Sequence, residues 1–338
     1  MPDTKNLRIL LKRRPTGEPK PADFKIVKTP VPSPGPGEML RRTIYLSLDP
    51  YMRGRMAAVK SYADPLELGH VMVGGTVSQV VQSNNPAFAQ GDIVLGYDGW
   101  QQYAVSSGEG VHKVDPSEAP MSYALGVLGM PGLTAYVGML DIGQPKAGET
   151  VVVSAATGAV GSVAGQIAKL KGCRVVGTAG SDAKCQFAVG ELGYDACVNY
   201  KTQELLPALR EACPNGIDVY FDNVGGAVLE AVLQLINRFA RIPLIGLISQ
   251  YNARKTPPGP NLGPILANRA MIKGMISGDH ADRIPDFHRD VSGWLREGRL
   301  KYHQTIVHGL ENAPQAFIGL FHGENLGKLL VQVSEDPQ

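Results

Sequence analysis

The pattern of apolar and polar positions changes at about residue 125. Before this point short apolar runs are separated by Gly, Asn and Pro, and those at residues 39–48, 71–82 and 92–97 predict β-strands. Residues 29–39 contain four prolines and cannot be helical, because proline fixes φ and has no backbone donor. Short strands at this spacing predict a β domain of barrel or sandwich type over residues 1–125.

From residue 126 onward, strand-like and helix-like segments alternate. A continuous apolar run at residues 151–155 predicts a strand that is buried on both faces. The alternation continues through a helix predicted at residues 225–237 and a strand predicted at residues 239–249. It indicates an α/β domain over residues 126–300, in which βαβ units form a parallel sheet with right-handed crossovers.

A Pro/Gly-rich segment at residues 255–264 interrupts this alternation, and it is interpreted either as a lid over a substrate or as an ordered surface loop. A strand at residues 271–277 and a helix at residues 281–298 are predicted after it. The tail, residues 301–338, holds two further strand-like runs. The most economical interpretation is that the tail returns to the first domain.

Composition narrows the class of protein. A chain of 338 residues corresponds to about two domains. Its 33 basic and 31 acidic residues give a net charge of +2, so electrostatics give no reason to expect a nucleic acid or a membrane surface as partner. The N-terminal stretch does not resemble a secretory signal, and no apolar run is long enough to span a membrane. We therefore expect a cytoplasmic protein whose four cysteines are reduced thiols.

A Gly-rich turn follows the first strand of the α/β domain. Residues 151–165 read VVVSAATGAVGSVAG, which predicts a strand, a tight turn and a helix. Gly158 would let the backbone approach a pyrophosphate, and Gly161 would allow close packing of helix on strand. Ala156 departs from the G-x-G-x-x-G pattern, since it occupies the first Gly position. The pattern indicates dinucleotide binding, and the alternative is a tight turn that binds no ligand.

The end of the second predicted strand favours NADP over NAD. An NAD site usually carries an acidic residue there, whereas this strand ends in Thr178, Ala179, Gly180 and Ser181. Asp182 lies just beyond and is interpreted as a residue of the first helical turn. Lys184 could meet a 2′-phosphate as a point charge, or it could be an ordinary solvated helix lysine.

Several long motifs carry a resemblance to a known family. They are LSLDPYMRGRM, GMPGLTAY, AATGAVGS, AGSDAK, NYKT, FDNVGG and GENLGK, and they span residues 46–328. The chain resembles the zinc-free medium-chain dehydrogenase/reductases, within them the prostaglandin reductases (leukotriene B4 12-hydroxydehydrogenases), the plant double-bond reductases and the bacterial curcumin reductases. The resemblance implies an α/β fold: a Rossmann doubly wound parallel sheet plus a GroES-like β-barrel domain. Members of the family are commonly homodimers.

The same resemblance implies a site for NADP (NADPH). The turn at residues 158–161 lines the pyrophosphate, and Lys184 and Tyr200 meet the 2′-phosphate. The nicotinamide lies along residues 245–251 and 275–277. The implied residues are Met130, Thr134, Thr157, Gly158, Ala159, Val160, Gly161, Gly180, Ser181, Lys184, Tyr200, Asn223, Ile245, Gly246, Leu247, Ile248, Ser249, Gln250, Tyr251, Met275, Ile276, Ser277 and Asn325.

The cysteines argue against the zinc site that many members of the superfamily carry. A catalytic zinc needs three protein ligands, typically Cys and His, but no Cys precedes Cys173. His70 stands where zinc-dependent members place a Gly-His-Glu segment, and here Val71 replaces the acid. We therefore expect no metal, and we interpret His70 as a structural or substrate-lining residue.

Without a strong Lewis acid, a conjugated C=C–C=O group is easier to reduce than an isolated carbonyl. Hydride adds to the β-carbon, the carbonyl oxygen gains charge as an enolate, and the α-carbon later takes a proton. Tyr251 and Tyr62 are the candidate donors or proton relay, with Tyr51 shaping the pocket. The cofactor ribose hydroxyl competes for this role, and each tyrosine could equally be a wall residue.

The sequence thus predicts an enzyme that reduces the C=C bond of α,β-unsaturated ketones and aldehydes with NADPH. Two alternatives remain open: an NADPH quinone oxidoreductase, and a non-catalytic NADPH-binding protein.

Overall fold

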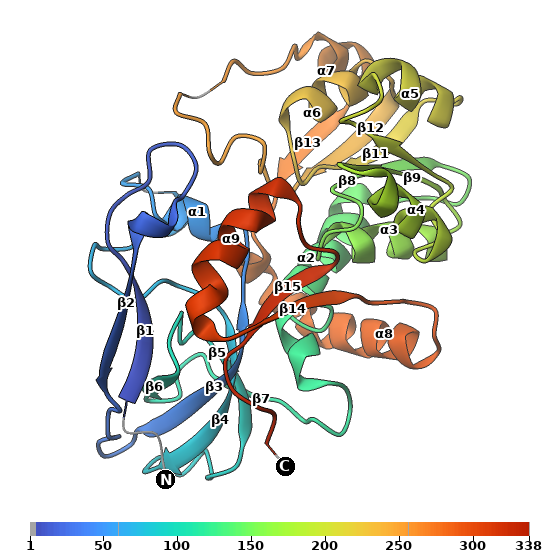
Figure 1. The fold of residues 1–338 in the computed structure, drawn as a ribbon. Helices are drawn as coiled ribbons and strands as arrows, with labels where there is room; N and C mark the ends of the chain where they lie inside the picture. The colour runs from blue at the N-terminus through green and yellow to red at the C-terminus, as the bar shows by residue number, and fades with distance from the viewer. Residues whose placement is uncertain (1–4, 60, 256, 338) are drawn as a thin grey trace. The chain divides into compact units, whose positions relative to one another are not determined.

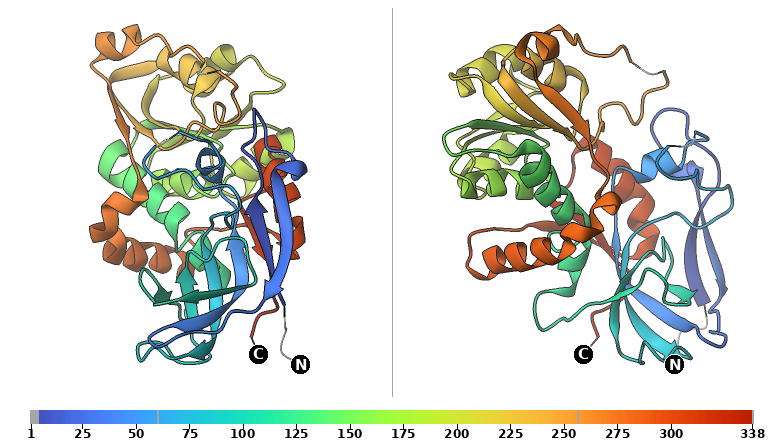
Figure 2. Two further views of the ribbon diagram at one scale, coloured as in Figure 1. Left: turned by 90° about the vertical axis from the view of Figure 1, so that its left-hand side faces the viewer. Right: turned by 180° about the vertical axis from the view of Figure 1, so that it is seen from behind.

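The computed structural model describes residues 5–59, 61–255 and 257–337. The chain separates into two compact units (Figures 1 and 2). Unit 1 comprises the described residues of Met1–Leu125, Gln304–Asn325 and Leu329–Gln338, and unit 2 comprises Gly126–His303 and Leu326–Lys328.

Unit 1 is built on a mixed sheet with the order β14-β15-β3-β4-β5-β7, and β6 pairs with β3. A separate hairpin of β1 and β2 completes its strands. The elements are β1 (Lys5–Leu11), η1 (Pro21–Asp23), β2 (Phe24–Pro30), β3 (Met39–Ser47), α1 (Met52–Arg55), β4 (Thr76–Ser83), β5 (Ile93–Gly96), β6 (Tyr103–Ser106), β7 (His112–Lys113), η2 (Met121–Leu125), β14 (Gln304–His308), η5 (Leu310–Asn312), α9 (Ala313–His322) and β15 (Lys328–Gln332).

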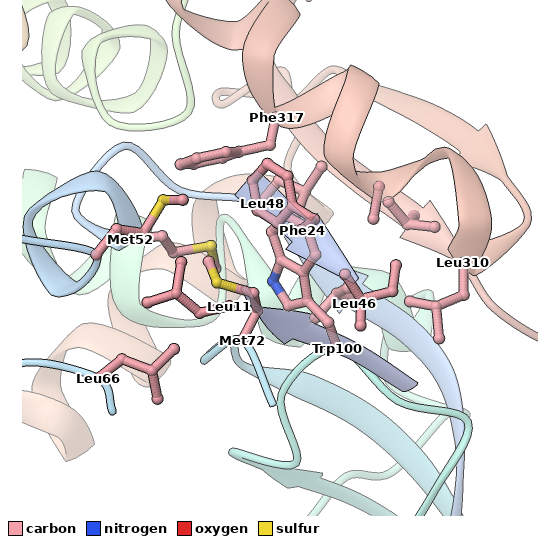
Figure 3. Packing of buried hydrophobic residues seen from close by; sticks show 14 of the residues in the cluster. Leu11, Phe24, Leu46, Leu48, Met52, Leu66, Met72, Trp100, Leu310 and Phe317 are labelled. Atoms are coloured by element: carbon pink, nitrogen blue, oxygen red, sulfur yellow. The ribbon is translucent and has the colours of Figure 1, made fainter. Parts of the chain in front are cut away.

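The tail contributes both strands and core to unit 1. β15 pairs antiparallel with β3, and the red tail elements run alongside the blue strands in Figures 1 and 2. In the main core Phe24 stacks on Trp100 with ring centroids 5.6 Å apart. Phe317 of α9 meets Trp100 edge-on at 5.7 Å, as Figure 3 shows. Since Phe317 and Trp100 are both fully buried, the core of this unit needs residues from both ends of the chain.

Unit 2 contains a six-stranded sheet with the order β10-β9-β8-β11-β12-β13, and every adjacent pair is parallel. Figure 1 shows α3 and α4 on one face and α5 and α6 on the other. The elements are α2 (Met130–Val137), η3 (Gly138–Gly143), β8 (Thr150–Ser154), α3 (Gly161–Leu170), β9 (Arg174–Ala179), α4 (Asp182–Gly190), β10 (Ala196–Asn199), α5 (Leu205–Ala212), β11 (Ile217–Phe221), α6 (Gly226–Leu233), β12 (Ile236–Leu244), α7 (Gly263–Asn268), β13 (Met271–Gly274), η4 (Ser277–Arg283) and α8 (Ile284–Arg296).

This arrangement confirms the predicted α/β class. The strand order reverses between β8 and β11, which are neighbours although β9 and β10 lie between them in the chain. Ligands of doubly wound sheets bind at the carboxyl ends of the strands beside such a reversal. A ligand site is therefore expected at the turn after β8 and the turn after β11.

Two predicted boundaries are wrong. β12 runs over Ile236–Leu244 instead of residues 239–249, and α6 ends at Leu233. The segment LQLI at residues 233–236 suits helix and strand alike, so the sequence pattern does not show the boundary, and the pairing of Ile236 with Ile217 places Ile236 in β12. After Leu244 the chain leaves the sheet, because the amides of Ile245 and Gly246 donate to the Asp222 carbonyl at 2.8 and 3.1 Å.

Unit 1 shows a similar correction. The strand predicted at residues 71–82 is interrupted, since β4 begins only at Thr76. Gly74 comes so close to its neighbours that a Cβ there would lie 2.8 Å from Leu46 Cδ1. The two glycines before Thr76 thus mark a close approach to the core rather than a continuous strand.

The expectation of four reduced thiols is wrong for one pair. Cys185 of α4 and Cys197 of β10 form a disulfide, with Cα atoms 5.1 Å apart. Helix α4 packs directly on β10, so residues 12 apart in sequence meet. Cys173 and Cys213 are free and buried.

No helix in the described part of the chain has the length and apolar character needed to cross a membrane.

Candidate functional site

The Gly-rich turn joins β8 to α3. The Gly158 amide donates to the Ala155 carbonyl at 2.9 Å, which closes the turn. A Cβ at Gly161 would lie only 2.3 Å from the same carbonyl oxygen, so no larger residue fits there without movement. The next residue, Ser162, has a buried hydroxyl with no hydrogen-bond partner among the described residues. A helix N-terminus with an unused buried hydroxyl fits the pyrophosphate group that the sequence predicts.

Ala156 fits this turn because another glycine makes room for it. A Cβ on Gly177 of β9 would lie 2.7 Å from the Ala156 Cβ. Ala156 is fully buried. The departure from the G-x-G-x-x-G pattern is therefore compensated on the neighbouring strand, which the local pattern alone does not show.

The tail touches the same turn. The Gly327 amide donates to the Thr157 carbonyl at 2.9 Å, and Gly158 and Gly327 form a parallel bridge. Both residues belong to unit 2. Asn325, the predicted tail residue of the site, directly precedes Leu326–Lys328 in the chain and belongs to the unit 1 segment Gln304–Asn325.

The ends of β9 and β10 bring two cations together. Ser181 caps α4, since its side chain accepts from the Lys184 amide at 3.3 Å. Burial lowers the pKa of the Lys184 ammonium, and the charge of Lys201 lowers it further. Neither lysine forms an ion pair with a described residue. A half-buried lysine and an exposed lysine beside it, neither paired with a described carboxylate, fit an anion such as the 2′-phosphate.

Tyr200 and Gly180 complete this edge. A Cβ at Gly180 would lie 2.7 Å from the Tyr200 hydroxyl oxygen and 3.3 Å from Lys201 Cε. Asp182 is turned away from this group, because its carboxylate accepts from the Asn199 side chain at 2.6 Å. Lys201 was not predicted, although its position directly after Tyr200 in the NYKT motif was a usable signal.

Asn223 lies at the strand-order reversal. Its side-chain amide donates to the Ser154 carbonyl at 2.7 Å and its backbone amide to the Ser154 hydroxyl at 2.9 Å. The neighbouring Asp222 accepts from the Tyr220 hydroxyl at 2.8 Å and from the Gly225 amide at 2.8 Å. Burial raises the Asp222 pKa. Asp222 was not predicted, because the motif FDNVGG does not show which groups bond to its carboxylate. Its hydrogen bonds nevertheless shape the turn that carries Asn223.

A cavity of about 470 Å³ lies in unit 2 at the carboxyl ends of β12 and β13. It unites the two predicted nicotinamide segments, and its lining comprises Leu244, Ile245, Gly246, Leu247, Tyr251, Lys273, Gly274, Met275, Ile276, Asp279 and His280. As far as the described residues go, the lining does not include Ile248, Ser249, Gln250 or Ser277. The Ser249 hydroxyl instead donates to the Val224 carbonyl at 2.6 Å.

Tyr251 faces this cavity with a protonated hydroxyl. Its oxygen accepts from the Leu247 amide at 3.3 Å. Burial raises the Tyr251 pKa above its ordinary value of 10.0, and the Leu247 amide opposes this rise. The group therefore keeps its proton at neutral pH and can donate it to an oxygen atom.

Met130 and Thr134 occupy helix α2. The Thr134 hydroxyl donates to the Met130 carbonyl at 2.7 Å, so its hydrogen bond stays inside the helix. The segment 255–264 was predicted as a single loop, but α7 begins at Gly263. Thr256 in this segment lies outside the described residues.

The other two predicted tyrosines belong to unit 1. Tyr51 directly precedes α1, and its hydroxyl is buried near Asp49, Tyr97 and Tyr62. Burial, and next the charge of Asp49, raise the Tyr51 pKa. Tyr62 is 60 % exposed. Tyr97, which directly follows β5, lies beside Tyr51 and was not predicted from the sequence.

The described residues contain no group of three or more His, Cys, Asp and Glu side chains that could hold a metal ion. His70 is exposed, and its Nε2 lies 3.3 Å from a Glu67 carboxylate oxygen.

A doubly wound unit with a phosphate turn and a second, β-rich unit define a class of nucleotide-dependent oxidoreductases. Comparison with known proteins agrees. Residues 7–114 match a family model described as the N-terminal domain of oxidoreductase, and residues 159–292 match one described as zinc-binding dehydrogenase. The chain belongs to the medium-chain dehydrogenase/reductase family, in the group of the curcumin, prostaglandin and 2-alkenal reductases.

The similar proteins match nearly the whole chain. An NADPH-dependent curcumin reductase of Escherichia coli is 52% identical over 338 residues, covering 98% of each chain. The 2-alkenal reductase (NADP(+)-dependent) of Nicotiana tabacum is 40% identical, covering 99% of each chain. CurA of Vibrio vulnificus, solved in complex with NADPH, has a TM-score of 0.94 and 52% identity, covering 98% of this chain and 100% of that one.

Proposed function

We propose that this protein reduces the C=C bond of α,β-unsaturated ketones and aldehydes with NADPH. The observation that carries the proposal is the anion site formed by Lys184, Lys201 and Tyr200 beside a phosphate turn. It is supported by full-length similarity to an NADPH-dependent curcumin reductase and to a 2-alkenal reductase.

The cofactor would lie along the carboxyl edge of the parallel sheet. The turn at residues 157–161 would hold the pyrophosphate, and Gly180, Ser181, Lys184 and Tyr200 the adenosine side. Asn223 and the cavity would hold the nicotinamide side, to which we also assign Met130, Thr134, Ser277 and Asn325. When bound, NADPH supplies the hydride.

The tyrosines act on the substrate carbonyl. As the β-carbon is reduced, negative charge develops on the carbonyl oxygen, and preorganised donors stabilise it. Tyr251 and Tyr62 donate hydrogen bonds to this oxygen or relay the proton to the α-carbon, and Tyr51 shapes the pocket. The raised pKa values of Tyr51 and Tyr251 keep both hydroxyls protonated at neutral pH.

The direct test follows NADPH oxidation at 340 nm with a panel of conjugated enones and enals. We expect turnover of these substrates, with product analysis showing a saturated ketone or aldehyde. Failure with every enone, together with turnover of quinones, would favour the quinone oxidoreductase alternative. Tight NADPH binding without turnover of any substrate would favour the non-catalytic alternative.

We also propose a cytoplasmic homodimer. Exposed apolar side chains of unit 2 support this assembly: Leu266 of α7 is 82% exposed, and Met271 of the terminal strand β13 is 42% exposed. Such side chains are favoured where a partner covers them. Light scattering of the purified chain should give twice its mass of 36.1 kDa, and a monomer would contradict the proposal.

A further inference from the structure

A buried tyrosine lies directly against the Gly-rich turn. Tyr194 precedes β10 in the chain, is 2% exposed, and is held by its amide, which donates to the Ala188 carbonyl at 3.1 Å. Nothing in the G-x-G-x-x-G pattern includes this residue, which follows Gly161 by more than thirty positions.

Its hydroxyl bridges the two ends of the turn. The hydroxyl donates to the Gly161 carbonyl at 2.8 Å and lies 3.3 Å from the Ala156 carbonyl. Ala156 lies at the start of the turn and Gly161 at its end. Burial raises the Tyr194 pKa, so the hydroxyl keeps the proton it donates.

Two glycines leave space for the ring. A Cβ at Gly165 of α3 would lie 2.1 Å from the Tyr194 ring, and a Cβ at Gly177 of β9 would lie 3.1 Å from it. Helix and strand thus approach the ring from two sides. Because Gly165 cannot carry a side chain while the ring is in place, and Gly177 leaves only a tight fit, packing as well as hydrogen bonds holds the ring.

The turn needs this support because it is built from alanines. Ala155 has φ of +49°, a left-handed conformation that disfavours residues with a Cβ by roughly 1 kcal/mol. Ala156 occupies a position where glycine is usual. A free turn of this sequence would relax toward ordinary backbone angles, and the amides that face a phosphate would move with it.

We propose that Tyr194 is a positioning residue that holds the Gly-rich turn in the conformation required by the pyrophosphate. This inference rests on the proposed placement of NADPH at residues 158–161. It implies that Tyr194 affects every dinucleotide alike, because the pyrophosphate is common to NADPH and NADH. Lys184, in contrast, should affect NADPH alone.

The test is Tyr194→Phe, which keeps the ring and removes the hydroxyl. We expect the dissociation constants of NADPH and NADH to rise by the same factor, about 5- to 10-fold, as for one lost buried hydrogen bond. The dissociation constant of 2′-AMP, which lacks the pyrophosphate, should stay unchanged, and kcat at saturating NADPH should change less than about twofold.

Tyr136→Phe is the matched control. Tyr136 is also 2% exposed, and its hydroxyl donates to Asp290 at 2.7 Å. This variant should lose a similar amount of thermal stability without weakening dinucleotide binding. If Tyr194→Phe behaves like Tyr136→Phe, with lower stability and unchanged affinity, Tyr194 is merely structural and the proposal is wrong.

Gly158→Val separates this outcome from failure of the cofactor placement. A side chain at Gly158 would enter the space assigned to the pyrophosphate. If Gly158→Val binds NADPH normally, the placement itself is wrong. If Gly158→Val loses binding while Tyr194→Phe retains it, the placement stands and only the role of Tyr194 is overturned.

Discussion

In the proposed placement of NADPH, the Gly-rich turn after β8 and the cationic edge at β9 and β10 would recognise different parts of the cofactor by different means. The turn is partly buried and would act through its backbone geometry, with Gly161 and Tyr194 packed against it. The edge is partly exposed and works through the side chains of Lys184, Lys201 and Tyr200. The comparison teaches that affinity for any dinucleotide and preference for NADPH are separable properties of this chain.

The largest effect is expected at the turn. Gly161→Ala places a Cβ 2.3 Å from the Ala155 carbonyl oxygen, so the turn must move. We expect the dissociation constants of NADPH and NADH to rise by about 100-fold, the upper range for overpacking. Fluorescence titration measures both. The control is Gly190→Ala, where a Cβ meets nothing within 4 Å. If the variant lost affinity for NADPH alone, the turn would not act on both dinucleotides alike, and the contrast between turn and edge would be wrong.

Loss of the hydroxyl of Tyr251, the proposed donor, should not weaken the binding of NADPH or NADH. Tyr251→Phe removes a donor for the developing enolate, and we expect kcat with an enone to fall about 30-fold while KM for NADPH changes little. Steady-state kinetics at saturating enone separate the two constants. An unchanged kcat would assign the donor role to Tyr62 or to the cofactor ribose hydroxyl.

Lys184→Ala should separate the two cofactors. Loss of a charge-assisted hydrogen bond is expected to raise KM for NADPH about 10-fold and to leave KM for NADH within about twofold. Lys171→Ala, an exposed lysine after α3, is the control. Equal changes in KM for NADPH and for NADH would show that the 2′-phosphate does not bind at this edge.

Lys201→Ala is expected to have the smallest effect, a rise of about threefold in KM for NADPH. It should also shift the pH dependence. In the proposed site the charged form of Lys184 binds the 2′-phosphate, and its lowered pKa means that this form is lost at lower pH than for an ordinary lysine. Preference for NADPH should therefore weaken toward alkaline pH, and in Lys201→Ala this weakening should move to higher pH. An unmoved profile would show that Lys201 does not act on Lys184.

What the sequence predicts correctly is local. Apolar runs and the glycines of the turn identify β8, α3 and the parallel sheet because period and turn chemistry are written in consecutive residues. The start of β12 was missed because the segment LQLI at residues 233–236 suits helix and strand alike, and only the pairing of Ile236 with Ile217 resolves it.

The missed residues of the site act through tertiary contacts. Tyr194 reaches the turn from the segment before β10, and Gly327 reaches it from the tail. The Asp222 carboxylate accepts hydrogen bonds from the Val224 and Gly225 amides. These bonds form only once the turn after β11 has its folded shape. The disulfide of Cys185 and Cys197 likewise depends on how α4 packs on β10. No spacing rule along the chain reveals such contacts.

The two-ended construction of unit 1 sets an order for synthesis. Leu125 leaves the ribosome about 200 residues before β15 and the aromatic ring of Phe317 follow it. At roughly 5–20 residues per second, this delay lasts tens of seconds. During that time the whole of Gly126–His303 emerges and is free to fold. Phe24 and Trp100 cannot yet pack against Phe317, because it has not been synthesised. Most of unit 2 can thus fold before the first part of the chain to be made receives its last strands and helix.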